Sequence, residues 1–140
     1  NILEVKFSAK SENESLSRVI VASFAAKLDP TLDELSDIKM AVSEAVTNSI
    51  VHGYEEDESK FVYLRCELED RMIKVVIEDR GKGIEDIKQA MQPMYTSKPE
   101  LDRAGMGFSF MESFMDTLEV VSIKGEGTKV VMTKTIELPK

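Results

Sequence analysis

The sequence has little of several features that would restrict where the protein works. Its one cysteine, Cys66, excludes an internal disulfide and lies among alternating apolar residues, which is typical of a buried strand face. No apolar run approaches the roughly 20 residues that a membrane-spanning helix needs, and the first residues lack the pattern of a signal peptide. We therefore expect a soluble, cytoplasmic protein without a membrane partner.

Positive charge is also in deficit, with 18 basic against 26 acidic residues and a net charge of −8. The electric field of this net negative charge repels nucleic acid and anionic membranes. Any phosphate-binding site must therefore rely on groups close to the phosphate. The sequence contains no repeat and no low-complexity tract. With 140 residues and 42% hydrophobic content, it has material for one ordinary core, which predicts a single domain over residues 1–140.

The chain opens with a pattern of period two and then changes to a helical one. Alternation over residues 3–10 predicts a half-buried strand. Ser11 and Glu14 have the spacing of a capping box, which predicts the start of a first helix. The apolar residues expected on the core side of that helix are Leu16, Val19, Ile20 and Phe24.

A second capping box, Thr31 with Glu34, opens a longer helix that Gly53 is placed to end. One side of this helix carries the expected core residues Leu35, Ile38, Val42, Ala45, Val46 and Ser49.

Another face of the second helix carries Glu44, Asn48 and His52, which are spaced four apart and so lie on one side. Carboxylate and carboxamide oxygens suit magnesium coordination and proton acceptance. A polar stripe is also what any amphipathic helix shows to solvent. His52 is more typical of a helix end than of a ligand.

The second half of the chain predicts two antiparallel strand pairs with helical and polar segments between them. The four strands are expected at residues 61–68, 72–78, 117–124 and 128–138. Residues 84–91 predict a short helix, residues 92–107 either a functional lid or a disordered segment, and Phe108 begins another short helix. Together these elements favour a two-layer α+β sandwich, with an antiparallel-rich sheet and its helices on one face.

Asp79, Gly81 and Gly83 follow the end of a strand, where paired glycines let the backbone come close to a ligand. Aspartate and glycine are also ordinary turn formers. The segment nearly matches a dinucleotide fingerprint, but Asp86 occupies the third glycine position and no long βαβ unit surrounds it.

Gly105 and Gly107 precede the helix at residue 108, and backbone amides at such a helix start form an anion site. Lys98 and Arg103 lie in the same segment, where they can reach a phosphate or keep the segment soluble. Thr128 supplies a hydroxyl at the start of the last strand, which alone is ordinary hairpin chemistry.

In their order, these segments resemble the N, G1 and G2 boxes and the closing Gly-Thr of the GHKL ATPases and kinases. The four segments are Glu44–Asn48, Asp79–Gly83, Gly105–Gly107 and Gly127–Thr128. The phenylalanine-rich lid box of the histidine kinases is missing, and the lid from Pro93 to Phe108 looks like that of the anti-sigma-factor serine kinases of spore-forming bacteria. The resemblance covers essentially the whole chain and implies the Bergerat fold, with a mixed, mostly antiparallel sheet.

The resemblance implies a site for ATP or ADP with Mg²⁺. Asp79 would accept a hydrogen bond from the adenine amino group, Gly81 and Gly83 would leave room for the base, and Thr128 would complete the adenine contacts. Asn48 would ligate the magnesium ion. The residues implied around the phosphates are Thr96, Ser97, Lys98, Gly105, Met106 and Gly107.

The same resemblance implies catalytic roles and partners. Glu44 would act as general base toward a serine hydroxyl of another protein, or orient it, and Arg103 would lie nearest the terminal phosphate. The implied partners are a sigma factor of the sigma-F type, held inactive, and an anti-anti-sigma protein phosphorylated on serine. Arg18 is a candidate partner contact or a plain solvated residue. The first strand, at a sheet edge, could pair with a second copy and make a homodimer.

Two other readings remain open. One is a nucleotide-gated module that sequesters a sigma factor without significant kinase activity, and it shares every ATP contact with the kinase. The other is an ATPase without a protein acceptor, which is the weaker of the two because 140 residues leave no room for the coupling domains of such proteins.

Overall fold

The computed structural model describes residues 1–84 and 107–138. Its elements, in chain order, are β1 (Ile2–Ser8), α1 (Ser11–Ala25), η1 (Ala26–Leu28), α2 (Leu32–Thr47), η2 (Asn48–Gly53), β2 (Phe61–Glu69), β3 (Met72–Asp79), α5 (Phe108–Phe114), β4 (Thr117–Ile123) and β5 (Gly127–Thr135). The helix expected at 84–91 and nearly all of the lid lie outside the described residues. Within the described ranges, no helix combines the length and apolar character needed to cross a bilayer.

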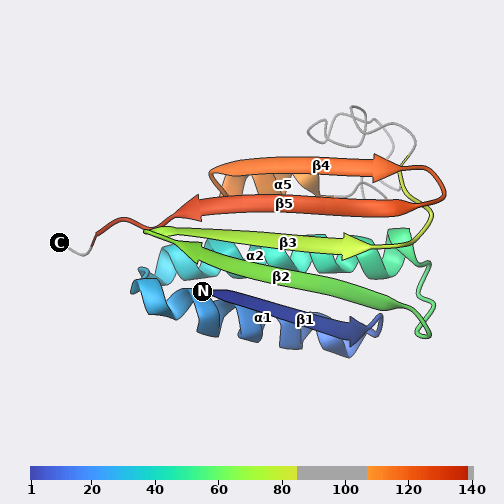
Figure 1. The fold of residues 1–140 in the computed structure, drawn as a ribbon, viewed down its shortest axis with the longest axis horizontal. Helices are drawn as coiled ribbons and strands as arrows, with labels where there is room; N and C mark the ends of the chain where they lie inside the picture. The colour runs from blue at the N-terminus through green and yellow to red at the C-terminus, as the bar shows by residue number, and fades with distance from the viewer. Residues whose placement is uncertain (85–106, 139–140) are drawn as a thin grey trace.

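The five described strands form one sheet in the order β1-β2-β3-β5-β4, and every neighbouring pair is antiparallel. Figure 1 shows α1, α2 and α5 together on one face of this sheet. The expected two-layer α+β sandwich is therefore confirmed. β1 lies at one edge of the sheet, as the sequence predicted, and β4 lies at the other.

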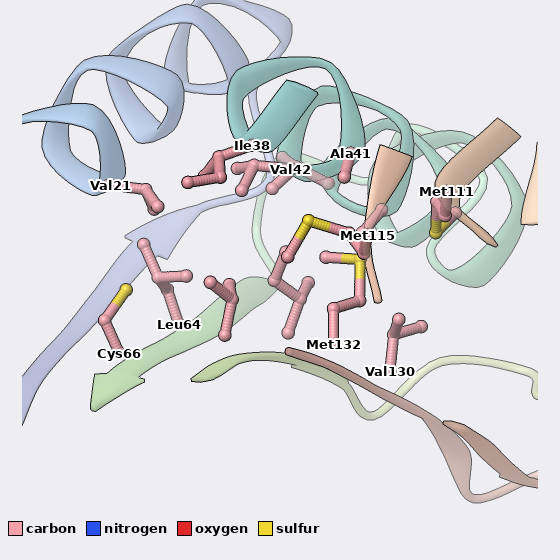
Figure 2. Close-up of a cluster of buried hydrophobic side chains, with 14 of the residues drawn as sticks. Val21, Ile38, Ala41, Val42, Leu64, Cys66, Met111, Met115, Val130 and Met132 are labelled. Carbon is pink, nitrogen blue, oxygen red and sulfur yellow. The ribbon is translucent and has the colours of Figure 1, made fainter. Parts of the chain in front are cut away.

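The hydrophobic core lies between the sheet and its helices (Figure 2), and burying each aliphatic side chain there contributes on the order of 1.5–3 kcal/mol. The largest fully buried side chains include Ile38, Leu64, Ile73, Ile77, Phe108, Met111 and Met132. Cys66 points into this core from β2, and its burial raises the pKa of its thiol to about 12. The prediction of a buried cysteine is confirmed.

The second helix begins where its capping box predicts. The Thr31 hydroxyl accepts from the Glu34 amide at 3.1 Å, and the Glu34 carboxylate accepts from the Thr31 amide at 2.9 Å. Four of the predicted core residues, Ile38, Val42, Ala45 and Val46, are buried on α2. Ser49 is buried one turn later in η2, and Leu35 is only partly buried against the core. Gly53 ends the helical segment, but through the π-helical turn η2 and without a left-handed conformation.

Two predictions for the first helix are wrong. Ser11 is the first helical residue rather than the cap, because the Glu14 side chain bonds the Ser43 hydroxyl of α2 and does not reach back to its own helix start. Leu16 and Val19 are 51% and 58% exposed. The other two expected core residues are correct, since Phe24 is buried and Ile20 packs against the core. The buried residues of the helix are Ser17, Val21, Phe24 and Ala25, so its core side is rotated from the expected one.

Candidate functional site

A pocket opens between the C-terminal end of the second helix and one end of the sheet. It is lined by Ala45, Asn48, Ser49, His52, Gly53, Asp79, Gly83, Ile84, Phe108, Thr128 and Val130. These residues come from stretches far apart in the sequence, and Figure 1 shows the end of β3, the start of β5 and the end of α2 at the same end of the molecule. The predicted residues Asn48, Asp79, Gly83 and Thr128 thus meet in one place.

A larger hollow lies on the helix-free face of the sheet and is open to solvent. Charged side chains of neighbouring strands line it, among them Glu4 and Arg65, whose carboxylate and guanidinium are 2.9 Å apart. It contains none of the predicted site residues, so its size does not make it the better candidate.

Asp79 is the acidic group at the centre of the pocket, and it is only 4% exposed at the end of β3. Its Oδ1 accepts from the Gly81 amide at 3.0 Å, and it also accepts from the Ser49 hydroxyl and the Thr128 amide. Burial raises the pKa of the Asp79 carboxyl, while these three hydrogen bonds oppose the rise. A buried carboxylate held by donors on one side keeps acceptor capacity for a ligand on the other.

Glycines surround Asp79 because the backbone packs too closely there for a side chain. A Cβ on Gly53 would lie 2.8 Å from an Asp79 carboxylate oxygen, and one on Gly81 would lie 2.1 Å from the Gly53 carbonyl oxygen. A Cβ on Gly83 would lie 2.2 Å from the Ile123 carbonyl oxygen, and Gly83 also has a φ of +74°. The glycines of this segment are therefore required by the folded backbone itself, in addition to any room that they leave for a base.

Glu44, on α2, lies beside this pocket, and its carboxylate faces the start of α5. The carboxylate oxygen Oε2 of Glu44 would be 2.3 Å from a Cβ on Gly107, and Gly107, with φ of +64°, caps the N-terminus of that helix. Burial, and next the negative charge of Glu14, raise the pKa of the Glu44 carboxyl. A carboxyl group with a raised pKa is a better proton acceptor, so Glu44 is suited to general-base catalysis.

The remaining described site residues complete the same end of the sheet. Asn48 begins η2, and its backbone amide still bonds the carbonyls of Glu44 and Ala45. Thr128 lies directly opposite Asp79 in the β3–β5 pairing. The Thr128 hydroxyl is 2.7 Å from the Ser122 hydroxyl, which in turn accepts from the Ile84 amide.

Two pocket residues, and a third residue that contacts Thr128 and Ile84 of the pocket, were missed or underrated from the sequence. Ser49 was assigned to the core, yet its hydroxyl bonds Asp79. His52 lies at the helix end, as expected, but also lines the pocket, where burial and then Lys82 lower the pKa of its imidazole. Its spacing with Glu44 and Asn48 was the available signal. Ser122 gave no signal at all, because only the β4–β5 pairing brings it to Thr128.

Other predicted residues are not part of the described pocket. Arg18 lies on α1, where its Nε is 3.1 Å from a Glu14 oxygen and 36% of its side chain is exposed. The phosphate and catalytic residues placed on the lid lie outside the described residues: Thr96, Ser97, Lys98, Arg103, Gly105 and Met106. Their roles remain predictions.

The geometry agrees with a comparison against protein families. Residues 7–134 match the family described as the histidine kinase-like ATPase domain. The chain belongs to this family. The resemblance to the GHKL ATPases is thereby confirmed, and the chain carries an ATPase domain, which implies that it binds ATP.

Within the histidine kinase-like ATPases, the chain groups with the anti-sigma F factors. It is 57% identical over 138 residues to the anti-sigma F factor of Clostridium acetobutylicum, covering 99% of this chain and 96% of the relative. It is 57% identical over 134 residues to that of Clostridium perfringens, covering 96% of both.

Two solved structures of histidine kinase-like ATPases show the same fold at low identity. One contains the RsbU and RsbW domains of a Mycobacterium tuberculosis protein, with a TM-score of 0.70, 18% identity, and coverage of 97% of this chain and 32% of that one. The other is the histidine kinase domain of a blue-light-activated kinase from Erythrobacter litoralis, with a TM-score of 0.60, 20% identity, and coverage of 88% and 61%.

Proposed function

We propose that this chain is a cytoplasmic anti-sigma factor that is also a protein serine kinase. It binds and inhibits a sigma factor of the sigma-F type, and it phosphorylates an anti-anti-sigma protein on serine with Mg-ATP. One observation carries the proposal: Asn48, Asp79 and Thr128 meet in a single pocket, and Glu44 lies beside it at the start of α5. The name of the relatives, anti-sigma F factor, supports the sigma-factor partner.

The nucleotide is oriented by the two ends of this pocket. Asp79 accepts a hydrogen bond from the adenine amino group, since its carboxylate is fixed by donors from Ser49, Gly81 and Thr128. Gly107, at the N-terminus of α5, offers its backbone to the phosphates. In the family pattern the lid residues add cations, with Arg103 nearest the terminal phosphate.

Asn48 is the residue that would hold the magnesium ion. Its carboxamide oxygen is a hard ligand of the kind that Mg²⁺ prefers. Within the described residues there is no cluster of three or more His, Cys, Asp or Glu side chains that could hold a metal on its own. A single carboxamide ligand fits a magnesium ion whose other ligands come mainly from the phosphates. When bound, the ion would neutralise the charge of the phosphates.

Glu44 carries the proton transfer. Its carboxylate takes the proton of the incoming serine hydroxyl while the serine oxygen bonds to the γ-phosphorus. The bond from that phosphorus to the bridging oxygen breaks, and ADP leaves with the electron pair. Phosphoryl transfer asks for little more than positioning and charge neutralisation. Glu44 would supply the positioning of the serine, and the magnesium ion and the lid cations would supply the charge neutralisation.

The proposed activity is tested by incubating the chain with γ-labelled ATP, magnesium and candidate anti-anti-sigma proteins. We expect label on a serine of the partner, and no label when that serine is replaced by alanine. Release of free phosphate with no labelled protein would favour the ATPase reading instead. Binding of the sigma factor without any transfer would favour the nucleotide-gated module.

We also propose that two copies associate through the β1 edge. Figure 1 shows α1 behind β1 at this edge, β1 has no strand on its outer side within the described residues, and the neighbouring α1 exposes Leu16 and Val19. An open strand edge next to apolar side chains suits pairing with a second copy.

In sedimentation equilibrium we expect a mass of about twice the monomer, in line with the commonness of twofold dimers. Leu16→Lys with Val19→Lys should shift the chain toward monomer, because both introduce like charges into the shared surface. Val121→Lys, on the opposite edge strand β4, is the matched control and should leave the mass unchanged. A monomer at every concentration tested would contradict the proposal.

A further inference from the structure

Glu14 lies between the first two helices and has a partner on each of them. Its Oε1 accepts a hydrogen bond from the Ser43 hydroxyl of α2. Its Oε2 is 3.1 Å from the Arg18 Nε one turn further along α1. Only 17% of the Glu14 side chain is exposed, so this carboxylate links the helices from the inside of their contact.

On α2, the residue that contacts Glu14 is the direct neighbour of the proposed general base, Glu44. Ser43 directly precedes Glu44, and the Glu14 charge acts on Glu44 strongly enough to help raise its pKa. Placing a second acidic group this close costs stability, since like charges repel most where water is partly excluded. Glu14 has no capping role that would explain its presence, because α1 begins without a side-chain cap.

Arg18 completes the arrangement on the outer side. Its Nε has no hydrogen-bond partner of good geometry within the described structure and depends on the charge of Glu14. Its terminal nitrogen Nη2 contacts the Ser15 hydroxyl at 3.4 Å, and about a third of the side chain faces solvent. A guanidinium with open donors can receive an acidic group of a partner protein while it holds Glu14 from behind.

We propose that Glu14 is a positioning residue for phosphoryl transfer, which holds the Glu44 turn of α2 through Ser43 and is itself held by Arg18. The proposal rests on the proposed kinase function. The contacts of Glu14 with Arg18 and Ser43 would then connect the surface of α1 with Glu44, which takes the serine proton. An acidic partner group that engages Arg18 therefore acts on the residue that positions the base.

The test measures kcat and KM for both substrates of the transfer reaction in full-length variants. Glu14→Gln, which removes the charge, and Ser43→Ala, which removes the donor, should each lower kcat about tenfold, in keeping with the cost of a small misplacement. KM for ATP should stay unchanged because neither residue lines the pocket. Ser43→Thr keeps a hydroxyl and should restore kcat.

Two further variants separate this role from general effects. Glu12→Gln removes the same charge from an exposed position of the same helix and should behave like the wild type. The double variant Glu14→Gln with Ser43→Ala should be no worse than Ser43→Ala alone, because both changes act on the same Glu14–Ser43 contact and such effects do not add.

Each outcome decides the matter. Transfer by Glu14→Gln at the rate of Glu12→Gln overturns the positioning role and leaves the kinase function standing. A lower unfolding temperature without a change in kcat also overturns it, because Glu14 would then only join the helices. If the wild-type chain transfers no phosphate to any candidate protein, the kinase function fails first and the role of Glu14 fails with it.

Discussion

A Glu44→Gln chain is expected to bind ATP like the wild type but to transfer phosphate at least about 100-fold more slowly, the usual contribution of a general base. Glutamine has the shape of glutamate, so the contact with Gly107 stays in place. It cannot take the serine proton, and it no longer repels the Glu14 charge. The loss should therefore appear in kcat and not in nucleotide affinity.

Single-turnover transfer from labelled ATP measures the rate, and calorimetry measures the affinity for ATP. Asp33→Asn is a suitable control, since it removes one acidic charge from an exposed position in the first turn of the same helix. Unchanged transfer by Glu44→Gln would remove the general-base assignment.

The same variant separates the two main functional readings. A kinase loses transfer at Glu44→Gln but keeps the sigma factor bound, because the pocket that orders the nucleotide is intact. In a nucleotide-gated module without kinase activity, there is no transfer to lose and every measured property of the variant stays near that of the wild type.

An Asp79→Asn chain is expected to lose ATP and ADP affinity by about 10- to 100-fold, which corresponds to one hydrogen bond to a charged group. The carboxylate is buried and lines the pocket, and asparagine would offer the adenine amino group only an uncharged, weaker acceptor in its place. All activities that need the nucleotide should fall with it.

The stability of the Asp79→Asn chain should move the other way. Because the folded pKa of Asp79 is raised, the folded state holds its proton more tightly than the unfolded state does. At neutral pH the charged carboxyl therefore costs folding free energy. Removing the charge should leave the unfolding temperature of the nucleotide-free chain unchanged or higher.

Calorimetric titration with ADP and a thermal melt without nucleotide check both expectations. Glu119→Gln removes an acidic charge from an exposed position of β4 and serves as the control. Wild-type affinity in the Asp79→Asn chain would disprove the adenine contact, and a large drop in unfolding temperature would show that its charge supports the fold.

Local signals were read well from the sequence, and signals set by distant contacts were not. The Thr31–Glu34 capping box was correct because both partners lie within one turn. The Ser11–Glu14 box has the same spacing but failed because Ser43, far along the chain, takes the Glu14 side chain.

The side of α1 that packs on the sheet was also beyond local reasoning. Apolar residues occur around much of this helix, so two stripes have helical spacing and only the position of the sheet selects between them. The stripe through Val21 is buried, while Leu16 and Val19 face outward.

The candidate site was predictable in its parts and in their order, but not in its internal contacts. The resemblance to the GHKL ATPases and kinases pointed to Asn48, Asp79 and Thr128, and all three line one pocket in the structure. The Ser49 hydroxyl on Asp79 and the π-helical turn that carries Asn48 depend on how α2 meets β3. No spacing in the sequence encodes that meeting.

The pairing of Asp79 with Thr128 also bears on how the chain folds. The hairpins β2–β3 and β4–β5 each close over short turns, whereas joining β3 to β5 closes a long loop and costs more chain entropy. The pocket therefore appears only once both hairpins have docked. A nucleotide that binds there recognises the completed fold alone, and so it would protect the chain from proteases that attack partly unfolded forms.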